Sequence, residues 1–395
     1  MTKNMFTENF SLFPLDSRFH VDRDFKIIVL TGGPGGGKST LLDVVKEWLK
    51  KEYGYSVYTM KEVASEMFDS GLLINPEFHI PNEDFQPIKI SYQLAKENFF
   101  VQGVGRSVAK KKVLFLDRGV MDDKQYAGQP LFEEILRKYG LSYMDVRDRR
   151  YDAVLHHETA ASLGDEYYIN NVNRTESPEG ARKRDLSTVE SWVGHRHHRI
   201  IPAMIDFDKK LQLLKRHVLQ ILGEPEPLEI ERKFLVEYCD PSKFSVPAET
   251  FQISQTYLKP NREGVCPRIR SVHQGSSAMF FETKKTFISA KKCREEEREL
   301  SLDEYLDLLY DNDPKLCTIE KRRTYFIYNK QCFELDLFEQ PYNNLALMEV
   351  ELLSENDPID LPPFIKIIRE VTDDMRYKNG ALAGLSLGTP GSIKE

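Results

Sequence analysis

The sequence predicts two domains of different fold class, an α/β domain with a parallel sheet followed by an α+β domain built on an antiparallel barrel with covering helices. Three observations predict this. The chain has 395 residues, too many for one ordinary core. A glycine-rich turn joins an apolar run to a helical pattern near the start, and the periodicity of the sequence changes to two after residue 228. The expected divisions are an N-terminal tail 1–24, an α/β domain 25–222, a linker 223–228, a barrel domain 229–387 and a C-terminal tail 388–395.

Charge and cysteine content narrow the class of protein. The net charge is −7, and the acidic excess lies after residue 222, so neither half has the basic excess of a nucleic-acid-binding protein. All five cysteines lie in the second half without C-x-x-C spacing, which argues against zinc and against a disulfide framework. We find no pattern of a signal peptide or membrane span and therefore expect a soluble protein of the cytoplasm.

The glycine-rich turn is a nucleotide-binding motif. Gly32, Gly37, Lys38 and Ser39 fit G-x-x-x-x-G-K-[ST], the P-loop, in which successive backbone N–H groups point at phosphate oxygens. The lysine is expected to reach the β- and γ-phosphates and the serine to bind Mg²⁺. The predicted nucleotide-binding residues here are Gly32, Gly33, Pro34, Gly35, Gly36, Gly37, Lys38, Ser39 and Thr40.

A second part of the same site follows four apolar residues, 113–116, which predict a buried parallel strand. Asp117 ends this run, at the edge of the sheet where α/β folds bind ligands, and is the expected second Mg²⁺ ligand. Arg118 is a candidate for contact with phosphate. Lys38 and Asp117 are the predicted catalytic residues of this domain.

The segment from 170 to 199 is polar and basic. Arg182 and Arg184, placed before a helix, are candidate lid residues that stabilise a transferring phosphate, and a solvated basic loop is the alternative. Asn173 is a candidate for contact with the base or ribose. His195 and His198 would share a helix face, but the neighbouring sequence offers no further ligand, so solvated or phosphate-facing histidines are favoured over a metal site.

The second domain carries charges in pairs spaced by two, which places both members on one face of a strand. Two carboxylates about 7 Å apart repel by about 2 kcal/mol at an effective dielectric of roughly 20, so sorting by sign is costly unless a ligand lies between them. A barrel with a polar interior would put divalent cations on the acidic strands and a polyphosphate on the basic ones. We expect segments 302–310 and 364–371 to be the covering helices. The pairs are Glu229 with Glu231 and then Lys233, Arg268 with Arg270, Glu282 with Lys284, Glu297 with Glu299, Lys321 with Arg323, Glu334 with Asp336, and Glu349 with Glu351.

This series of pairs resembles the signature of the CYTH, or triphosphate tunnel metalloenzyme, family. The resemblance implies an eight-stranded tunnel, Mg²⁺ or Mn²⁺ bound by the acidic residues, and hydrolysis of triphosphates. The implied metal ligands are Glu229, Glu231, Glu297, Glu299, Glu334, Asp336, Glu349 and Glu351. The implied phosphate ligands are Lys233, Arg268, Arg270, Lys284, Lys321 and Arg323, and Lys233 is a candidate to orient the attacking water.

The first domain resembles the AAA-type P-loop family that includes the nicotinamide riboside kinase part of the NadR proteins. The order of the two domains is similar to the family of TRPL translocation defect protein fourteen, associated with membrane-protein trafficking. This second resemblance implies GTP as the nucleotide, acidic phospholipid headgroups as tunnel ligands, and peripheral association with membranes.

The expected function is binding and hydrolysis of a nucleoside triphosphate, GTP or ATP, joined to a tunnel that binds a polyphosphate or a lipid headgroup with Mg²⁺ or Mn²⁺. Two alternatives stay open at this stage. One is a small-molecule kinase that uses Arg182 and Arg184. The other is a trafficking regulator in which nucleotide binding changes the exposure of the tunnel or of an apolar stripe at 204–221.

Overall fold

The computed structural model describes residues 23–71, 80–169, 176–260, 265–289 and 292–385. The chain divides into two compact units, and the division passes through the predicted α/β domain. The first unit comprises Met1–Thr31 and Leu42–Tyr151, and the second comprises Gly32–Leu41 and Asp152–Glu395.

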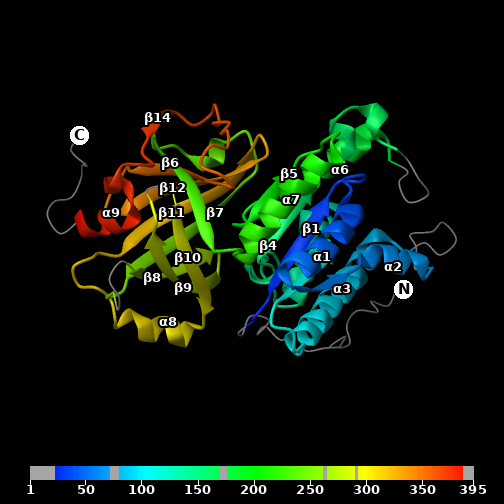
Figure 1. Ribbon diagram of the computed structural model, residues 1–395, viewed down its shortest axis with the longest axis horizontal. Coiled ribbons are helices and arrows are strands. Elements are labelled where there is room, and N and C mark those ends of the chain that lie inside the picture. Colours follow the sequence, from blue (N-terminus) through cyan, green and yellow to red (C-terminus); the bar gives the residue numbers. More distant parts are fainter. Residues whose placement is uncertain (1–22, 72–79, 170–175, 261–264, 290–291, 386–395) are drawn as a thin grey trace, which may run out of the picture. The chain divides into compact units, whose positions relative to one another are not determined.

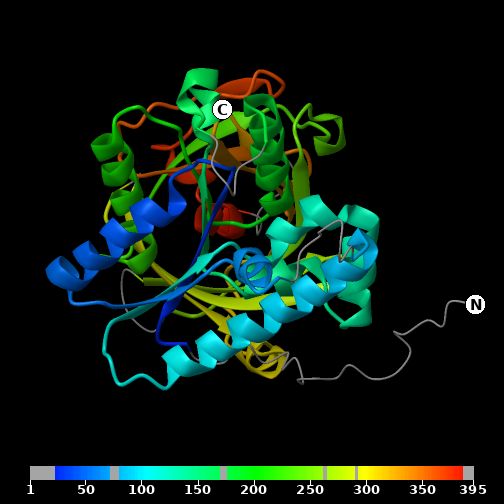
Figure 2. The same ribbon diagram turned by 90° about the vertical axis from the view of Figure 1, so that its right-hand side faces the viewer.

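The first unit is built on parallel strands. β1 (Lys26–Gly32), β2 (Ser56–Met60) and β3 (Lys112–Asp117) lie in the order β2-β3-β1, with Ile28 opposite Phe115 and Val57 opposite Val113. The side chains 113–116 are fully buried, as the apolar run predicts. α3 (Asn82–Gly105), the long cyan helix of Figure 2, contacts β2 and β3. The other elements are α1 (Lys38–Tyr53), which belongs to this unit from Leu42 onward, α2 (Val63–Asp69), η1 (Val120–Asp123), α4 (Lys124–Ala127), α5 (Gln129–Lys138) and η2 (Met144–Arg149).

The second unit begins with the glycine-rich loop, which leads into α1. β4 (Ala153–His157) and β5 (His198–Ile201) pair in parallel. The remaining elements before the barrel are η3 (Ala160–Ser162), η4 (Asp165–Tyr167), α6 (Pro178–Trp192) and α7 (Phe207–Leu222).

Two expectations for this region are wrong. Arg182 and Arg184 belong to α6 itself, because Ser177 caps the helix by accepting from the Gly180 N–H and Pro178 occupies its first turn. His195 and His198 do not share a helix face. α6 ends at Trp192, and the chain turns before His198 starts β5.

The rest of the second unit is an eight-stranded antiparallel barrel. Its order is β10-β9-β8-β7-β11-β12-β13-β6, and pairing of β10 with β6 closes it (Figure 1). The ninth strand, β14 (Ile367–Glu370), pairs with the far end of β6. The barrel strands are β6 (Leu228–Val236), β7 (Ala248–Tyr257), β8 (Val265–Gln274), β9 (Ser277–Phe287), β10 (Lys292–Leu300), β11 (Ile319–Tyr328), β12 (Gln331–Gln340) and β13 (Ala346–Leu352). η5 (Pro241–Lys243), η6 (Met375–Tyr377) and α9 (Asn379–Leu385) complete the fold.

Strand alternation turns the apolar side chains outward, where other segments cover them. Phe333, Leu335, Met348 and Val350 are buried on the outer face of β12 and β13, in a cluster with Ile365. α8 (Leu302–Leu309) covers β8, β9 and β10 at one end of the barrel (Figure 1), as expected.

The segment 364–371 is not a helix. It contains β14, which continues the sheet beside β6. Pro362 and Pro363 precede it, and the chain turns at 363–365 before β14 begins. In the described part of the chain, no helix has the length and apolar character needed to cross a membrane.

Candidate functional site

The glycine-rich loop is tightly enclosed by the end of β4. Gly32 has φ +133°, and a Cβ there would lie 2.0 Å from the His157 carbonyl oxygen. A Cβ on Gly36 would lie 2.6 Å from the same oxygen. Only glycine permits this close approach of the two backbones. The loop therefore curves around the N-terminus of α1, and the N-terminus of a helix favours a bound anion.

Asp185, on α6, holds the loop from one side, and no motif in the sequence selects it. Its carboxylate accepts from the Gly33 N–H at 2.7 Å and from the Thr159 N–H at 3.2 Å, and it lies 3.0 Å from His156 Nε2. The Thr159 hydroxyl in turn donates to the Pro34 carbonyl at 2.6 Å. These contacts fix the loop before any ligand arrives.

Two lysines reach the loop. Lys38 Nζ donates to the carbonyl oxygens of Gly32 and Gly33 at 3.3 and 3.4 Å, while Ser39 and Thr40 are exposed. Lys210 Nζ, from α7, donates to the Gly36 carbonyl at 3.0 Å. Burial lowers the pKa of Lys210 to about 8, although Glu158 and Asp185 favour its charged form.

The first unit holds Asp117 at the end of β3, as predicted, and Arg118 directly after it. Arg118 has a positive φ of 70°, and its backbone N–H donates to Leu30 O at 3.0 Å. Its guanidinium donates to Glu62 Oε1 at 2.6 Å and lies 3.4 Å from Asp122. These carboxylates raise its pKa against the effect of burial. The phosphate contact predicted for Arg118 would require it to leave Glu62.

The predicted lid arginines are engaged by their own neighbours. Arg182 donates to the Ala161 carbonyl at 2.8 Å and to Asp165 Oδ1 at 2.7 Å. Arg184 lies 3.4 Å from Glu176 Oε1. Asn173 lies outside the described residues.

The interior of the barrel is divided by charge. The acidic strands β12, β13, β6 and β10 are neighbours because β10 pairs with β6, and the basic strands β9, β8 and β11 complete the circle with β7. A polar tunnel therefore has one acidic wall and one basic wall. This arrangement suits a polyphosphate with divalent cations between the walls.

The most buried contacts of the tunnel centre on Asp336. Its carboxylate accepts from Arg323 Nε at 2.7 Å and Nη2 at 2.6 Å and from Lys321 Nζ at 2.5 Å. Arg323 also donates to Glu334 and, at 3.1 Å, to Glu349. Burial, with Arg323 close by, lowers the pKa of Lys321 to about 8, and burial raises the pKa of Glu334 to about 7.

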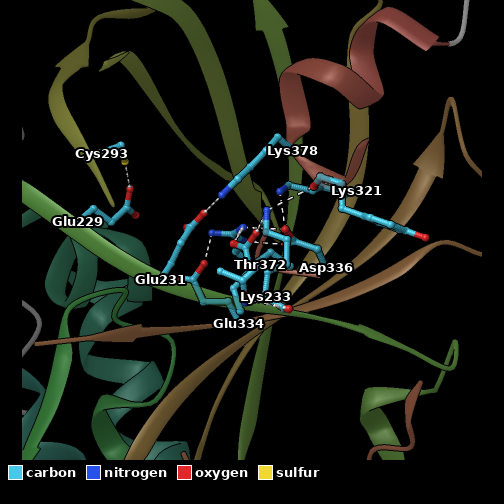
Figure 3. A network of polar contacts seen from close by, with 12 residues as sticks. Glu229, Glu231, Lys233, Cys293, Lys321, Glu334, Asp336, Thr372 and Lys378 are labelled. Carbon is cyan, nitrogen blue, oxygen red and sulfur yellow. Dashed lines mark hydrogen bonds and ion pairs between the residues drawn. The ribbon is translucent and has the colours of Figure 1, made fainter. Parts of the chain in front are cut away.

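Figure 3 shows how β6 and the C-terminal segment complete this network. Lys233 Nζ lies 2.5 Å from Glu349 Oε1 and is buried. Lys378, which follows η6, extends toward Glu231 with Nζ 3.4 Å from Oε1. Lys378 is a tunnel residue that the sequence did not reveal, because no strand alternation selects it.

One predicted tunnel residue is on the wrong face. Lys284 lies on the outer face of β9, 43% exposed and 3.2 Å from Glu282. The adjacent Lys285 points inward and contacts both Glu229 and Glu295 at 2.5 Å. In a Lys-Lys pair the sequence cannot tell which member faces inward, and only the register of β9 with its neighbours decides.

On β10 the sequence selected Glu297 and Glu299 but missed Glu295, which has the same alternation. Glu297 accepts from Arg270, from Arg196 and, at 2.9 Å, from the Thr283 hydroxyl. Arg268 lies 3.8 Å from Glu295. Glu299 is half-buried and lies opposite Phe281 on β9.

The donor set of the acidic wall fits a divalent cation. Oxygen atoms of Glu229 and Glu295 lie within 4.8 Å of each other, while the neighbouring Cys293 thiol, whose pKa burial raises to about 12, donates to Glu229 at 3.2 Å and stays protonated. Carboxylate oxygens are the ligands that Mg²⁺ and Mn²⁺ prefer. Lys285 contacts both carboxylates, so its ammonium group already supplies a positive charge to this part of the acidic wall.

Comparison with known proteins separates the two domains. Residues 27–208 match the model of a family described as an AAA domain. An inorganic triphosphatase of Nitrosomonas europaea is 34% identical over 157 residues, which are 39% of this chain and 96% of that protein. This chain belongs to the family of that inorganic triphosphatase. Its closed eight-stranded barrel has the tunnel fold of that triphosphatase family.

The chain is also similar to two solved structures. One is a crystal structure of an inorganic triphosphatase, 32% identical in sequence. The match covers 40% of this chain and 94% of that protein, with a TM-score of 0.28. The other is a protein of Pyrococcus horikoshii, 20% identical in sequence. The match covers 33% of this chain and 80% of that protein, with a TM-score of 0.26.

Proposed function

We propose that this chain is a phosphohydrolase with two sites. The tunnel binds and hydrolyses a triphosphate with Mg²⁺ or Mn²⁺, and the P-loop binds and hydrolyses the Mg²⁺ complex of a nucleoside triphosphate, GTP in preference to ATP. The observation that carries the tunnel proposal is the division of one closed barrel into an acidic and a basic wall.

In the tunnel the carboxylates of the acidic wall would hold the metal, whose chemistry is to neutralise phosphate charge and lower the pKa of water. Arg268, Arg270 and Arg323 would bind phosphate oxygens, because guanidinium groups stay charged when buried and donate in pairs. Lys233 and Lys321 would bind the remaining oxygens. The ion pairs seen here keep these groups in position until the substrate exchanges with them.

In the P-loop, the backbone N–H groups of 32–40 and Lys38 would bind the phosphates, while Ser39 would hold Mg²⁺. The support for this is the enclosed glycine loop with its exposed serine. The alternative, a small-molecule kinase acting through Arg182 and Arg184, would require Arg182 to exchange its contacts with Ala161 and Asp165 for phosphate, and it predicts phosphate on an acceptor in place of free phosphate.

Phosphate release tests both sites at once. We would offer GTP, ATP and inorganic triphosphate, each with Mg²⁺, to the wild type, Lys38→Ala and Arg268→Ala. The expected result is that Lys38→Ala loses nucleotide turnover alone and Arg268→Ala loses triphosphate turnover alone. Thermal unfolding of each variant controls for folding. A wild type that releases no phosphate from any of the three would refute the proposal.

The tunnel has a second candidate ligand, an acidic phospholipid headgroup, which offers the same phosphate chemistry to the basic wall. Cosedimentation with phosphatidic acid liposomes would test it. If the liposomes retain the wild type and do not retain Arg268→Ala/Arg270→Ala, the lipid ligand and peripheral membrane association are supported. Equal retention of the wild type and this double variant would exclude the lipid as a ligand.

A further inference from the structure

The segment His195–Arg199 has no role in either site as described so far. It follows α6 and enters β5, and with the barrel it belongs to the second compact unit. Two of its arginines nevertheless end on carboxylates of the acidic wall. Arg196 donates to Glu297 on β10, and Arg199 donates to Glu351 on β13. Both carboxylates are among the predicted metal ligands.

The two arginines differ in how firmly they are held. Arg199 is 12% exposed, and Gln220 of α7 donates to the same Glu351 at 2.8 Å, so this contact anchors the segment. Arg196 is 40% exposed and rests on the Phe281 ring, with its guanidinium carbon 4.8 Å from the ring centroid. Arg196 is therefore the member of the pair with room to change partner.

Glu297 is shared by two arginines, and Glu295 is the other carboxylate close to it. Arg196 and Arg270 both donate to this one carboxylate, and Phe281 lies beneath both guanidinium groups. Arginine does not lose its proton in proteins, so a cation bound to Glu297 would leave two guanidinium groups in need of an anion.

We propose that Arg196 is a phosphate-binding residue of the tunnel, contributed by the chain before β5, which holds Glu297 while the metal is absent and turns to a phosphate oxygen of the triphosphate once the metal takes that carboxylate. This inference rests on the proposed triphosphate site. It assigns to the tunnel a ligand that lies outside the barrel strands, so that the barrel needs the preceding chain for its complete phosphate site.

The proposal makes two predictions of opposite sign. Removing Arg196 removes a competitor of the metal, so Mn²⁺ alone should bind several-fold more tightly. It also removes a charge-assisted hydrogen bond to phosphate, so tripolyphosphate in the presence of Mn²⁺ should bind about tenfold more weakly. A purely structural role of Arg196 would weaken both.

The experiment is isothermal titration of the full chain with MnCl₂ and then with tripolyphosphate. All proteins carry Lys38→Ala, which weakens phosphate binding at the P-loop and leaves the same P-loop in every variant, so that differences between the variants report on Arg196. Arg196→Ala is compared with the parent, with Arg196→Lys, and with Arg216→Ala, which removes an exposed arginine 3.8 Å from Asp357. Arg216→Ala should match the parent, and Arg196→Lys should recover part of the tripolyphosphate affinity.

The proposal would be supported if Arg196→Ala binds Mn²⁺ more tightly and tripolyphosphate more weakly than the parent, with unchanged thermal unfolding. Parallel losses of both affinities would overturn it in favour of a structural contact, and unchanged affinities would overturn it outright. If the parent itself binds no tripolyphosphate, the proposed function of the tunnel fails, and this result is distinct because it precedes any change at Arg196.

Discussion

The glycine loop and the tunnel are both suited to phosphate, but they hold their binding groups by different means. In the loop the donors are backbone N–H groups, and what shapes them is the absence of side chains at Gly32 and Gly36. In the tunnel the donors are side chains on separate strands, held by carboxylates such as Asp336. The shape of the loop therefore depends on two glycines and the few groups packed against them, whereas the tunnel depends on the register of eight strands.

This comparison predicts that the tunnel is the more sensitive to loss of a charge. Asp336→Ala would leave Lys321 and Arg323 buried without their main partner, which should lower the free energy of unfolding by about 3–5 kcal/mol. Urea unfolding measures it. The control is Glu237→Ala, whose pair with Lys366 is exposed and should cost less than about 1 kcal/mol. Equal effects of the two substitutions would contradict the comparison.

The loop should instead be the more sensitive to added volume. Gly32→Ala places a Cβ 2.0 Å from the His157 oxygen at a φ that alanine avoids, so we expect a loss of about 3 kcal/mol and of nucleotide binding. Gly103→Ala, within α3, meets nothing within 4 Å and should be neutral or stabilising by about 0.5–1 kcal/mol. Nucleotide binding by fluorescence and urea unfolding are the measurements, and a Gly32→Ala variant that binds normally would refute the geometry.

The lysines of the two sites should respond differently to pH. Carboxylates raise the pKa of Lys233 in the tunnel against burial, while burial lowers the pKa of Lys210 beside the loop to about 8. Folded Lys210 thus binds its proton less well than the unfolded chain does, whose lysine pKa is about 10.4. Between pH 8 and about 10.4 the unfolding free energy of the wild type should rise relative to Lys210→Met, by about 3 kcal/mol in total. Urea unfolding across this pH range measures the effect. If the unfolding free energy of the wild type fell relative to Lys210→Met as the pH rises, the pKa of Lys210 would be raised in the folded protein, not lowered.

The smallest expected effect tests the faces of β9. Lys284→Ala should change the unfolding free energy by less than about 0.5 kcal/mol and leave tripolyphosphate binding unchanged, because its side chain is 43% exposed on the outer face. Lys285→Ala should weaken tripolyphosphate binding, since that lysine lies on the inner face between Glu229 and Glu295. The reverse pattern in titration calorimetry would show that the register of β9 is wrong.

The sequence by itself determined the features that depend on neighbouring residues. The loop at 32–40, the buried strand before Asp117 and the paired charges of the barrel strands are local patterns, because strand alternation and the conformations open to glycine act over a few residues. For the same reason α8 was predictable, since Ser301 and Glu304 form a capping box ahead of an apolar helix face.

Only the tertiary structure decided which side chains meet. Asp185 reaches the Gly33 N–H from 152 residues away, and Arg196 reaches Glu297 from 101 residues away. Lys285, and not Lys284, faces the tunnel because the pairing of β9 with β8 and β10 sets which face of β9 lies inside. The composition of β9 does not decide this. Contacts of this kind follow from closure of the barrel and the path of the chain around it, and no short stretch of sequence contains them.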